Sequence, residues 1–208
     1  MSAMDAGAPP VEWAMPPGAK QDWLFGTGAT TAERGLVLAG SLVGIGVVAA
    51  SGALADVGWA PWQLALAALI AADLFGGAVA NACGSNKRQY FGPMPEHPGV
   101  ATRLARSRLG FAALHVYPIV IALLFPGVSL AWGIAWYVAM LVATAIMEWI
   151  PPYLQRPGAM LLFVAAVAVA AVLSWGPGGW EWFVPVFFAK LVLAHAVREE
   201  PYRPAPGT

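Results

Sequence analysis

The sequence predicts an all-α, polytopic integral membrane protein, a bundle of about six transmembrane helices with the N- and C-termini cytoplasmic. Of its 208 residues, 59% are hydrophobic and only 11% are charged, whereas soluble domains carry about 25% charged residues. The apolar residues form long runs, and the basic residues gather on alternate connections between them. The formal net charge is zero. We therefore expect the lipid bilayer as a partner and no nucleic acid, because no overall basic field is present.

The first three predicted helices cover residues 35–55, 62–82 and 109–125. Each is measured against the roughly 20 apolar residues that a helix needs to cross a hydrocarbon layer about 30 Å thick. The first contains Gly40-x-x-x-Gly44, a small-residue motif typical of packing between membrane helices. The third is near the short limit and ends at Pro126-Gly127.

The last three predicted helices cover residues 128–150, 159–175 and 180–197. Pro151-Pro152 ends the fourth, and Gly176-Pro177-Gly178-Gly179 ends the fifth, which is also short. These connections predict antiparallel neighbours. The chain then has three parts, a polar arm, a transmembrane domain and a cytoplasmic tail, over residues 1–32, 33–198 and 199–208.

The basic residues predict the orientation, because Lys and Arg are retained on the cytoplasmic side of short loops. They lie before the first predicted helix, in the second and fourth loops and after the last helix: Lys20, Arg34, Lys87, Arg88, Arg103, Arg106, Arg108, Arg156, Arg198 and Arg203. Tryptophan, which prefers the membrane interface, marks the opposite side: Trp59, Trp62, Trp132, Trp175, Trp180 and Trp182. We expect a cell-membrane location, the inner membrane if the source is a bacterium.

A polar face on the second predicted helix indicates a functional site. Asp73, Gly77 and Asn81 recur every four residues and share one face. Lys190 lies at a similar depth in the sixth helix, roughly 12–16 Å from the outer end. Because an isolated charge in a membrane helix costs at least about 2.5–3.5 kcal/mol, we predict an ion pair between Asp73 and Lys190 inside the bundle. It would be a structural lock or a proton-coupled gate. A Schiff-base role for Lys190 has no supporting motif.

A second polar group is predicted near the cytoplasmic leaflet, where several helices deliver hydrogen-bonding side chains to one zone. Its members are Asn81, His115, Glu148, His195 and Glu199. A histidine and a carboxylate together serve as a general acid and base or as a proton relay. A plainer interpretation is that the histidines are satisfied near the interface. His115 and His195 are also candidate axial ligands for haem.

Cysteine and metal-binding patterns narrow the chemistry. Cys83 is the single cysteine, so neither a disulfide nor a multi-cysteine metal site can be built within the chain. No His-Glu-x-x-His motif, Gly-rich phosphate loop or nucleophile elbow is present. We expect no metal site, and the sequence leaves the cofactor undefined.

Three classes of function fit these features. The first is a small transporter or channel-like protein with Asp73 and Lys190 in its pathway and the polar group at its cytoplasmic mouth. The second is a membrane-embedded enzyme acting on a lipid or other apolar substrate, with His115 or His195 as acid or base. The third is an accessory subunit of a larger membrane complex, with or without a bound haem. A homo-oligomer is also consistent with the sequence.

Overall fold

A computed structural model describes residues 11–54, 57–173 and 176–202. Within these ranges the chain forms helices joined by loops, together with an isolated β-bridge between Val11 and Tyr202. In order, the helices are α1 (Thr31–Leu54), α2 (Pro61–Ala82), α3 (Gly84–Phe91), α4 (Val100–Arg106), α5 (Arg108–Ala113), α6 (Tyr117–Leu124), α7 (Leu130–Trp149), α8 (Pro152–Leu173), α9 (Phe183–Phe188) and the π-helix η2 (Ala189–His195). Trp175, Arg203 and the outer parts of the predicted arm and tail lie outside the described residues.

Four helices are long and apolar enough to cross a membrane: α1, α2, α7 and α8. The count becomes five if α4 and the following segment Arg108–Leu124, bent by 98° relative to it, are taken as one span. Large apolar side chains cover the outside of these helices, such as Leu42 on α1, Val138 on α7 and Leu161 on α8. Such a surface suits contact with lipid rather than water, and it is consistent with a membrane protein.

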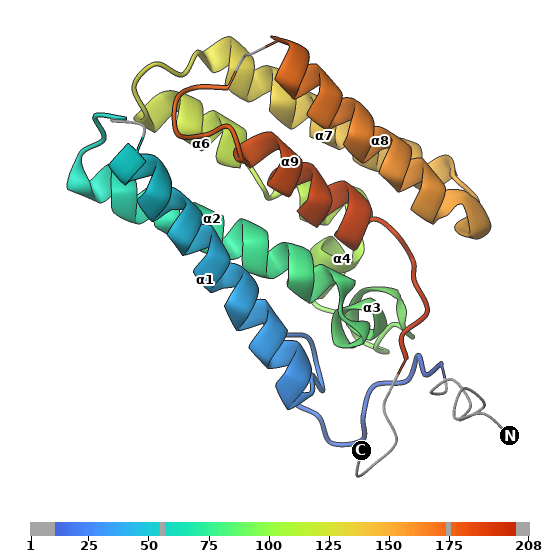
Figure 1. The fold of residues 1–208 in the computed structure, drawn as a ribbon. Helices are drawn as coiled ribbons and strands as arrows, with labels where there is room; N and C mark the ends of the chain where they lie inside the picture. Colours follow the sequence, from blue (N-terminus) through green and yellow to red (C-terminus); the bar gives the residue numbers. More distant parts are fainter. Residues whose placement is uncertain (1–10, 55–56, 174–175, 203–208) are drawn as a thin grey trace, which may run out of the picture.

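Glycines let α1 and α2 approach each other closely (Figure 1). A Cβ at Gly44 would lie 2.6 Å from the carbonyl oxygen of Ala71, so only glycine fits there. The Ser41 hydroxyl donates a hydrogen bond to the Ala72 carbonyl at 3.0 Å, beside Gly76. The predicted Gly40-x-x-x-Gly44 motif therefore packs two helices together, as small residues do in membranes.

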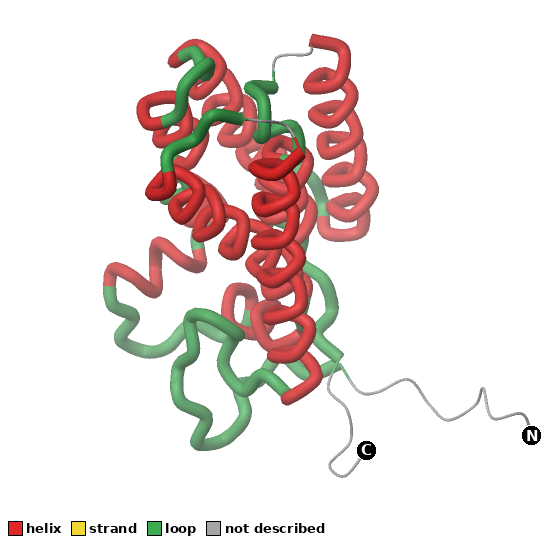
Figure 2. The backbone as a smooth tube through the Cα atoms, turned by 60° about the vertical axis from the view of Figure 1, so that its left-hand side comes forward, coloured by secondary structure: helices red, strands yellow, loops and turns green. Residues whose placement is uncertain are grey.

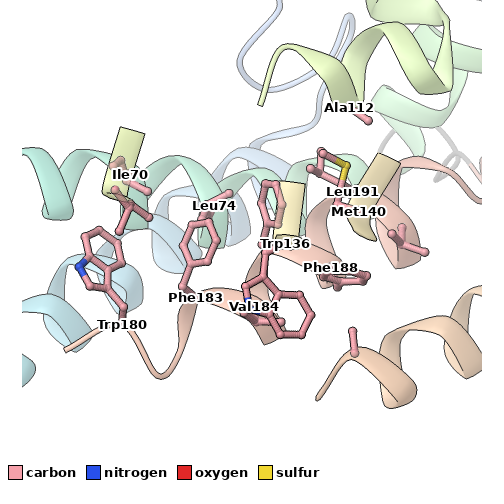
Figure 3. Close-up of a cluster of buried hydrophobic side chains, with 14 of the residues drawn as sticks. Ile70, Leu74, Ala112, Trp136, Met140, Trp180, Phe183, Val184, Phe188 and Leu191 are labelled. Carbon is pink, nitrogen blue, oxygen red and sulfur yellow. The ribbon is translucent and has the colours of Figure 1, made fainter. Parts of the chain in front are cut away.

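The C-terminal pair of helices, α9 and η2, forms the centre of the fold. Phe183, Phe187, Leu191 and Val192 are fully buried, against α2, α7 and α8. Figure 3 shows Trp136 and Met140 of α7 in the same core as Phe188 of α9. Together, α9 and η2 span only Phe183–His195, fewer residues than the predicted 180–197. A helix enclosed by protein is not held to the length that lipid contact requires.

The third and fifth predicted helices differ from their observed counterparts. The segment predicted as one helix, 109–125, consists of α5 and α6 with a break at Leu114–Val116. The fifth begins at Pro152 rather than at residue 159, because proline is well suited to the first turn of a helix, where its missing N–H has no partner to lose. Arg156 therefore lies within α8 instead of in a loop, and Pro157 is tolerated inside that helix.

A cap of short elements covers one end of the bundle. The predicted second loop contains α3 and α4, and the N-terminal arm and C-terminal tail lie against the same end (Figures 1 and 2). The Glu12 amide donates to the Pro201 carbonyl at 3.0 Å, and the Arg198 guanidinium lies 4.7 Å from the Trp13 ring centroid. Both ends of the described chain are therefore held together beneath the helices.

Candidate functional site

The predicted ion pair between Lys190 and Asp73 is present. Lys190 Nζ lies 2.5 Å from Asp73 Oδ2 and also donates to the backbone carbonyl of Asp73 at 3.2 Å. The lysine side chain is 3% exposed, but the aspartate side chain is 44% exposed. The sequence predicts both groups inside the bundle, and only the lysine is buried there. The pair is thus open on the side of its carboxylate.

Gly77 makes room for the lysine. A Cβ at this position would lie 2.5 Å from Lys190 Cε and 2.8 Å from Nζ. Gly76, on the adjacent row of α2, instead faces Ser41 of α1. The small-residue face of α2 is therefore divided, with one row serving helix packing and the other admitting a charged side chain.

The break between α5 and α6 brings two further groups to the ion pair. Tyr117, the first residue of α6, donates its hydroxyl hydrogen bond to Asp73 Oδ2 at 2.8 Å. His115 lies in the break itself, with its ring centroid 5.6 Å from that of Tyr117. His115 Nδ1 lies 2.8 Å from the carbonyl oxygen of Phe111. Nε2 is therefore the ring nitrogen left to exchange a proton or bind another group. A continuous helix would not present these residues together.

The π-helix adds His195 to the same region. Residues five apart are separated by about 140° around an α-helix, and the wider π-turn reduces that separation. Lys190 and His195 are five apart within η2. His195 is 1% exposed, and its Nδ1 has no hydrogen-bond partner among the described residues. This is an unsatisfied polar atom in the core, a feature that is uncommon and often functional.

Phe111 contacts both imidazole rings. Its ring stacks on His195 with centroids 3.9 Å apart and lies 4.7 Å from His115. Tyr90 of α3 meets His195 edge-on at 4.6 Å. A haem ligated by both histidines would have to displace Phe111, so the two side chains as placed do not suit that cofactor. Within the described ranges, no group of three metal-ligating side chains is found either.

Helix α3 was expected to be part of a basic loop, and instead its polar side chains are buried from Ser85 to Tyr90. Hydrogen bonds from these residues hold neighbouring segments in place. The Ser85 amide donates a hydrogen bond to the Glu33 carboxylate at 3.0 Å, and the Gln89 side-chain oxygen accepts from the Thr27 amide and hydroxyl. A buried, well-partnered polar helix of this kind specifies one arrangement of its surroundings.

Lys87 is the α3 residue that reaches furthest into the bundle. Its ammonium donates to the carbonyls of Ala194 and, at 2.7 Å, Val197, and lies 3.6 Å from Glu199 Oε2. Carbonyls at a helix end need such donors. Burial lowers the pKa of Lys87 from 10.5 to about 8, despite the opposing attraction of Glu199. This role is not predictable from the sequence, since a lysine in a basic loop also serves orientation.

The remaining predicted residues do not form one cluster. Asn81 Nδ2 donates to the Lys190 carbonyl at 3.3 Å, so it joins the central site through the backbone of η2. Glu148 pairs with Arg108 at 2.9 Å near the cap. Glu199 pairs with Arg156 at 2.9 Å in addition to Lys87. Two groups result, the central one around Asp73 and Lys190, and the cap group around Lys87.

Comparisons of the chain with protein-family models, curated proteins and solved structures give no significant match. The geometry of these two groups is therefore the basis for assigning a function.

Proposed function

We propose that this protein is a six-span transporter of the cell membrane that couples movement of a solute to movement of a proton at the Asp73–Lys190 pair. The observation that carries the proposal is that a broken helix and a π-helix meet at the half-buried Asp73–Lys190 charge pair. Transporters commonly build midplane sites from discontinuous helices. In the same way, the α5–α6 break supplies His115 and Tyr117 to the carboxylate of Asp73.

The placement of the termini supports six crossings. The bridge between Val11 and Tyr202 holds both ends at one end of the bundle, which requires an even number of crossings. Four helices are long enough to cross, and taking the α5–α6 segment and the shorter apolar α9–η2 helix as crossings too brings the proposed number to six. The basic residues of α3 and α4 lie at the same end as the termini, which the positive-inside tendency assigns to the cytoplasm.

A series of titratable groups supports proton coupling. From the half-exposed Asp73, the series runs through Lys190, Tyr117 and His115 to His195. Lys87 and Glu199 continue it to the cap, and Glu199 is partly exposed there. Ionisable residues in membrane segments commonly mark such relays. Phe111 interrupts the series between the two histidines, so its movement would be part of the transfer.

The test is a transport assay on the full chain in proteoliposomes with an imposed pH gradient and a trapped pH-sensitive dye. Inorganic ions, amino acids, sugars and carboxylates are added outside in turn. We expect one class to dissipate the gradient with the wild-type protein and not with Asp73→Asn. Asp22→Asn, which removes the carboxylate charge from a partly buried ion pair with Arg34 outside the central site, serves as the control and should transport normally. The proposal fails if no solute moves protons faster than in protein-free vesicles, or if Asp73→Asn matches the wild type.

A second candidate, a subunit of a larger membrane complex, is favoured by the surface of α8. Only 11% of the most apolar stretch of α8 is buried within the chain, and Leu161, Val164 and Val172 are exposed. A constant set of co-purifying subunits, lost when these residues are changed to smaller ones, would support this function over an independent transporter.

A further inference from the structure

The ammonium of Lys190 contacts two oxygen atoms of Asp73, and a hydroxyl oxygen of Tyr117 lies next to one of them. Asp73 provides a carboxylate oxygen at 2.5 Å and a backbone carbonyl oxygen at 3.2 Å. The Tyr117 hydroxyl oxygen is 2.8 Å from that same carboxylate oxygen. Carboxylate, carbonyl and hydroxyl oxygens are the ligands of hard cations such as the alkali and alkaline-earth ions. The lysine thus occupies a position built as a cation site.

The site is accessible on one side and narrow on the other. The Asp73 side chain is 44% exposed, so an ion that reaches this face of α2 meets the carboxylate without passing through the protein core. On the opposite side, the lysine stem lies against Gly77. The ammonium is held by hydrogen bonds and charge at the end of a flexible chain, and a short movement of that chain would free the oxygens.

The charge of the site selects a monovalent cation. One carboxylate faces one ammonium, and among the described residues no other carboxylate forms an ion pair with Lys190 that could balance a divalent ion. A single positive charge exchanged for another leaves the net charge of the interior unchanged, which avoids the cost of an uncompensated buried charge.

We propose that the Asp73 site binds a small monovalent metal cation in exchange for the proton of Lys190. An N–H bond of the ammonium breaks, its electron pair stays on Nζ, and the proton leaves to water. The neutral amine withdraws from Asp73, and the cation takes its place on the carboxylate, so that one positive charge enters for each one released. This inference rests on the proposed transport function and names its solute as an alkali cation.

The experiment measures proton release from the purified full chain in detergent with a pH indicator and little buffer. LiCl, NaCl, KCl and choline chloride are added at equal ionic strength. We expect about one proton per chain with at least one of the metal chlorides, since one ammonium is replaced by one cation, and none with choline. If no metal chloride releases more protons than choline chloride, the inference is wrong.

Variants separate the parts of the exchange. Lys190→Met should bind the cation, measured by calorimetry, without releasing a proton. Gly77→Ala moves Lys190 from its seat and should lower proton release, whereas Gly46→Ala, which has open space around it, should behave as the wild type. Normal proton release from Gly77→Ala would contradict the assigned position of the Lys190 side chain against Gly77. The proton-release measurement on the wild-type protein remains a valid test even if a variant fails to fold.

The two proposals fail in different ways. Proton-coupled flux of an organic solute, with no metal-driven proton release in detergent, keeps the transport function and overturns the cation site. Metal-driven proton release in detergent, without any flux in proteoliposomes, keeps the cation site and overturns transport.

Discussion

At the scale of single residues, exposure makes the two members of the central pair unequal. Lys190 is enclosed and depends on Asp73 for compensation of its charge, while Asp73 is partly open and has the Tyr117 hydroxyl as a second partner. The pair was predictable because two costly charges at equal depth need each other. The openness of Asp73 was not, since spacing along α2 does not say which neighbour covers that face.

This inequality predicts the effects of three variants on stability. Asp73→Asn leaves a buried ammonium without a countercharge and should cost about 3 kcal/mol, while Lys190→Met should cost clearly less. The double variant should be close to Lys190→Met alone, because the two sites are coupled. Unfolding of each purified variant in detergent provides the measurement. Equal costs that add in the double variant would show that the charges do not interact.

At the scale of elements, the sequence indicated the long helices better than the short ones. Runs such as those of α1, α2 and α7 are long, apolar and bounded, so their ends agree within a few residues. The α5–α6 break has only Pro118 as a local signal, and a proline is equally compatible with an unbroken membrane helix. Helix α3 reads as a polar loop, because tertiary contacts, not its own pattern, bury its side chains.

The contact between α3 and η2 predicts a pH dependence of stability. The pKa of Lys87 is about 8 in the folded chain and near 10.5 in the unfolded chain. Between these values the unfolded chain binds more protons, so the free energy of unfolding should rise with pH across this window, by at most about 3 kcal/mol. Below pH 8 the full cost of burying the charge is present, and above 10.5 it is gone.

The measurement compares the wild type with Lys87→Met, which cannot titrate at this position. Unfolding in detergent from pH 8 to 10.5 should show the wild type gaining stability relative to the variant. Other groups titrate in both proteins and cancel in the difference. Parallel curves over this range would mean that Lys87 is solvated, contrary to its contacts with Ala194 and Val197.

At the scale of the whole molecule, the fold joins two ends that the sequence could only place on the same side. The Val11–Tyr202 bridge and the Arg198–Trp13 contact connect arm and tail. The sequence predicts two polar groups in the bundle. The observed cap group differs in membership from the predicted one, because Lys87 and Glu199 meet only after the tail folds back. Contacts between segments more than 100 residues apart leave no pattern in either segment alone.

The shared end of arm and tail predicts the labelling of two cysteine variants in intact cells. In a Cys83→Ser background, Gly178→Cys lies in the connection before α9, where open space surrounds the glycine, and Lys20→Cys lies in the exposed arm. With an even number of crossings and the basic cap inside, a membrane-impermeant maleimide should label Gly178→Cys directly. Lys20→Cys should react only after the membrane is opened. Labelling of both positions from the same side would place the 176–182 connection and the cap together, which no arrangement with α9 and η2 as a crossing allows.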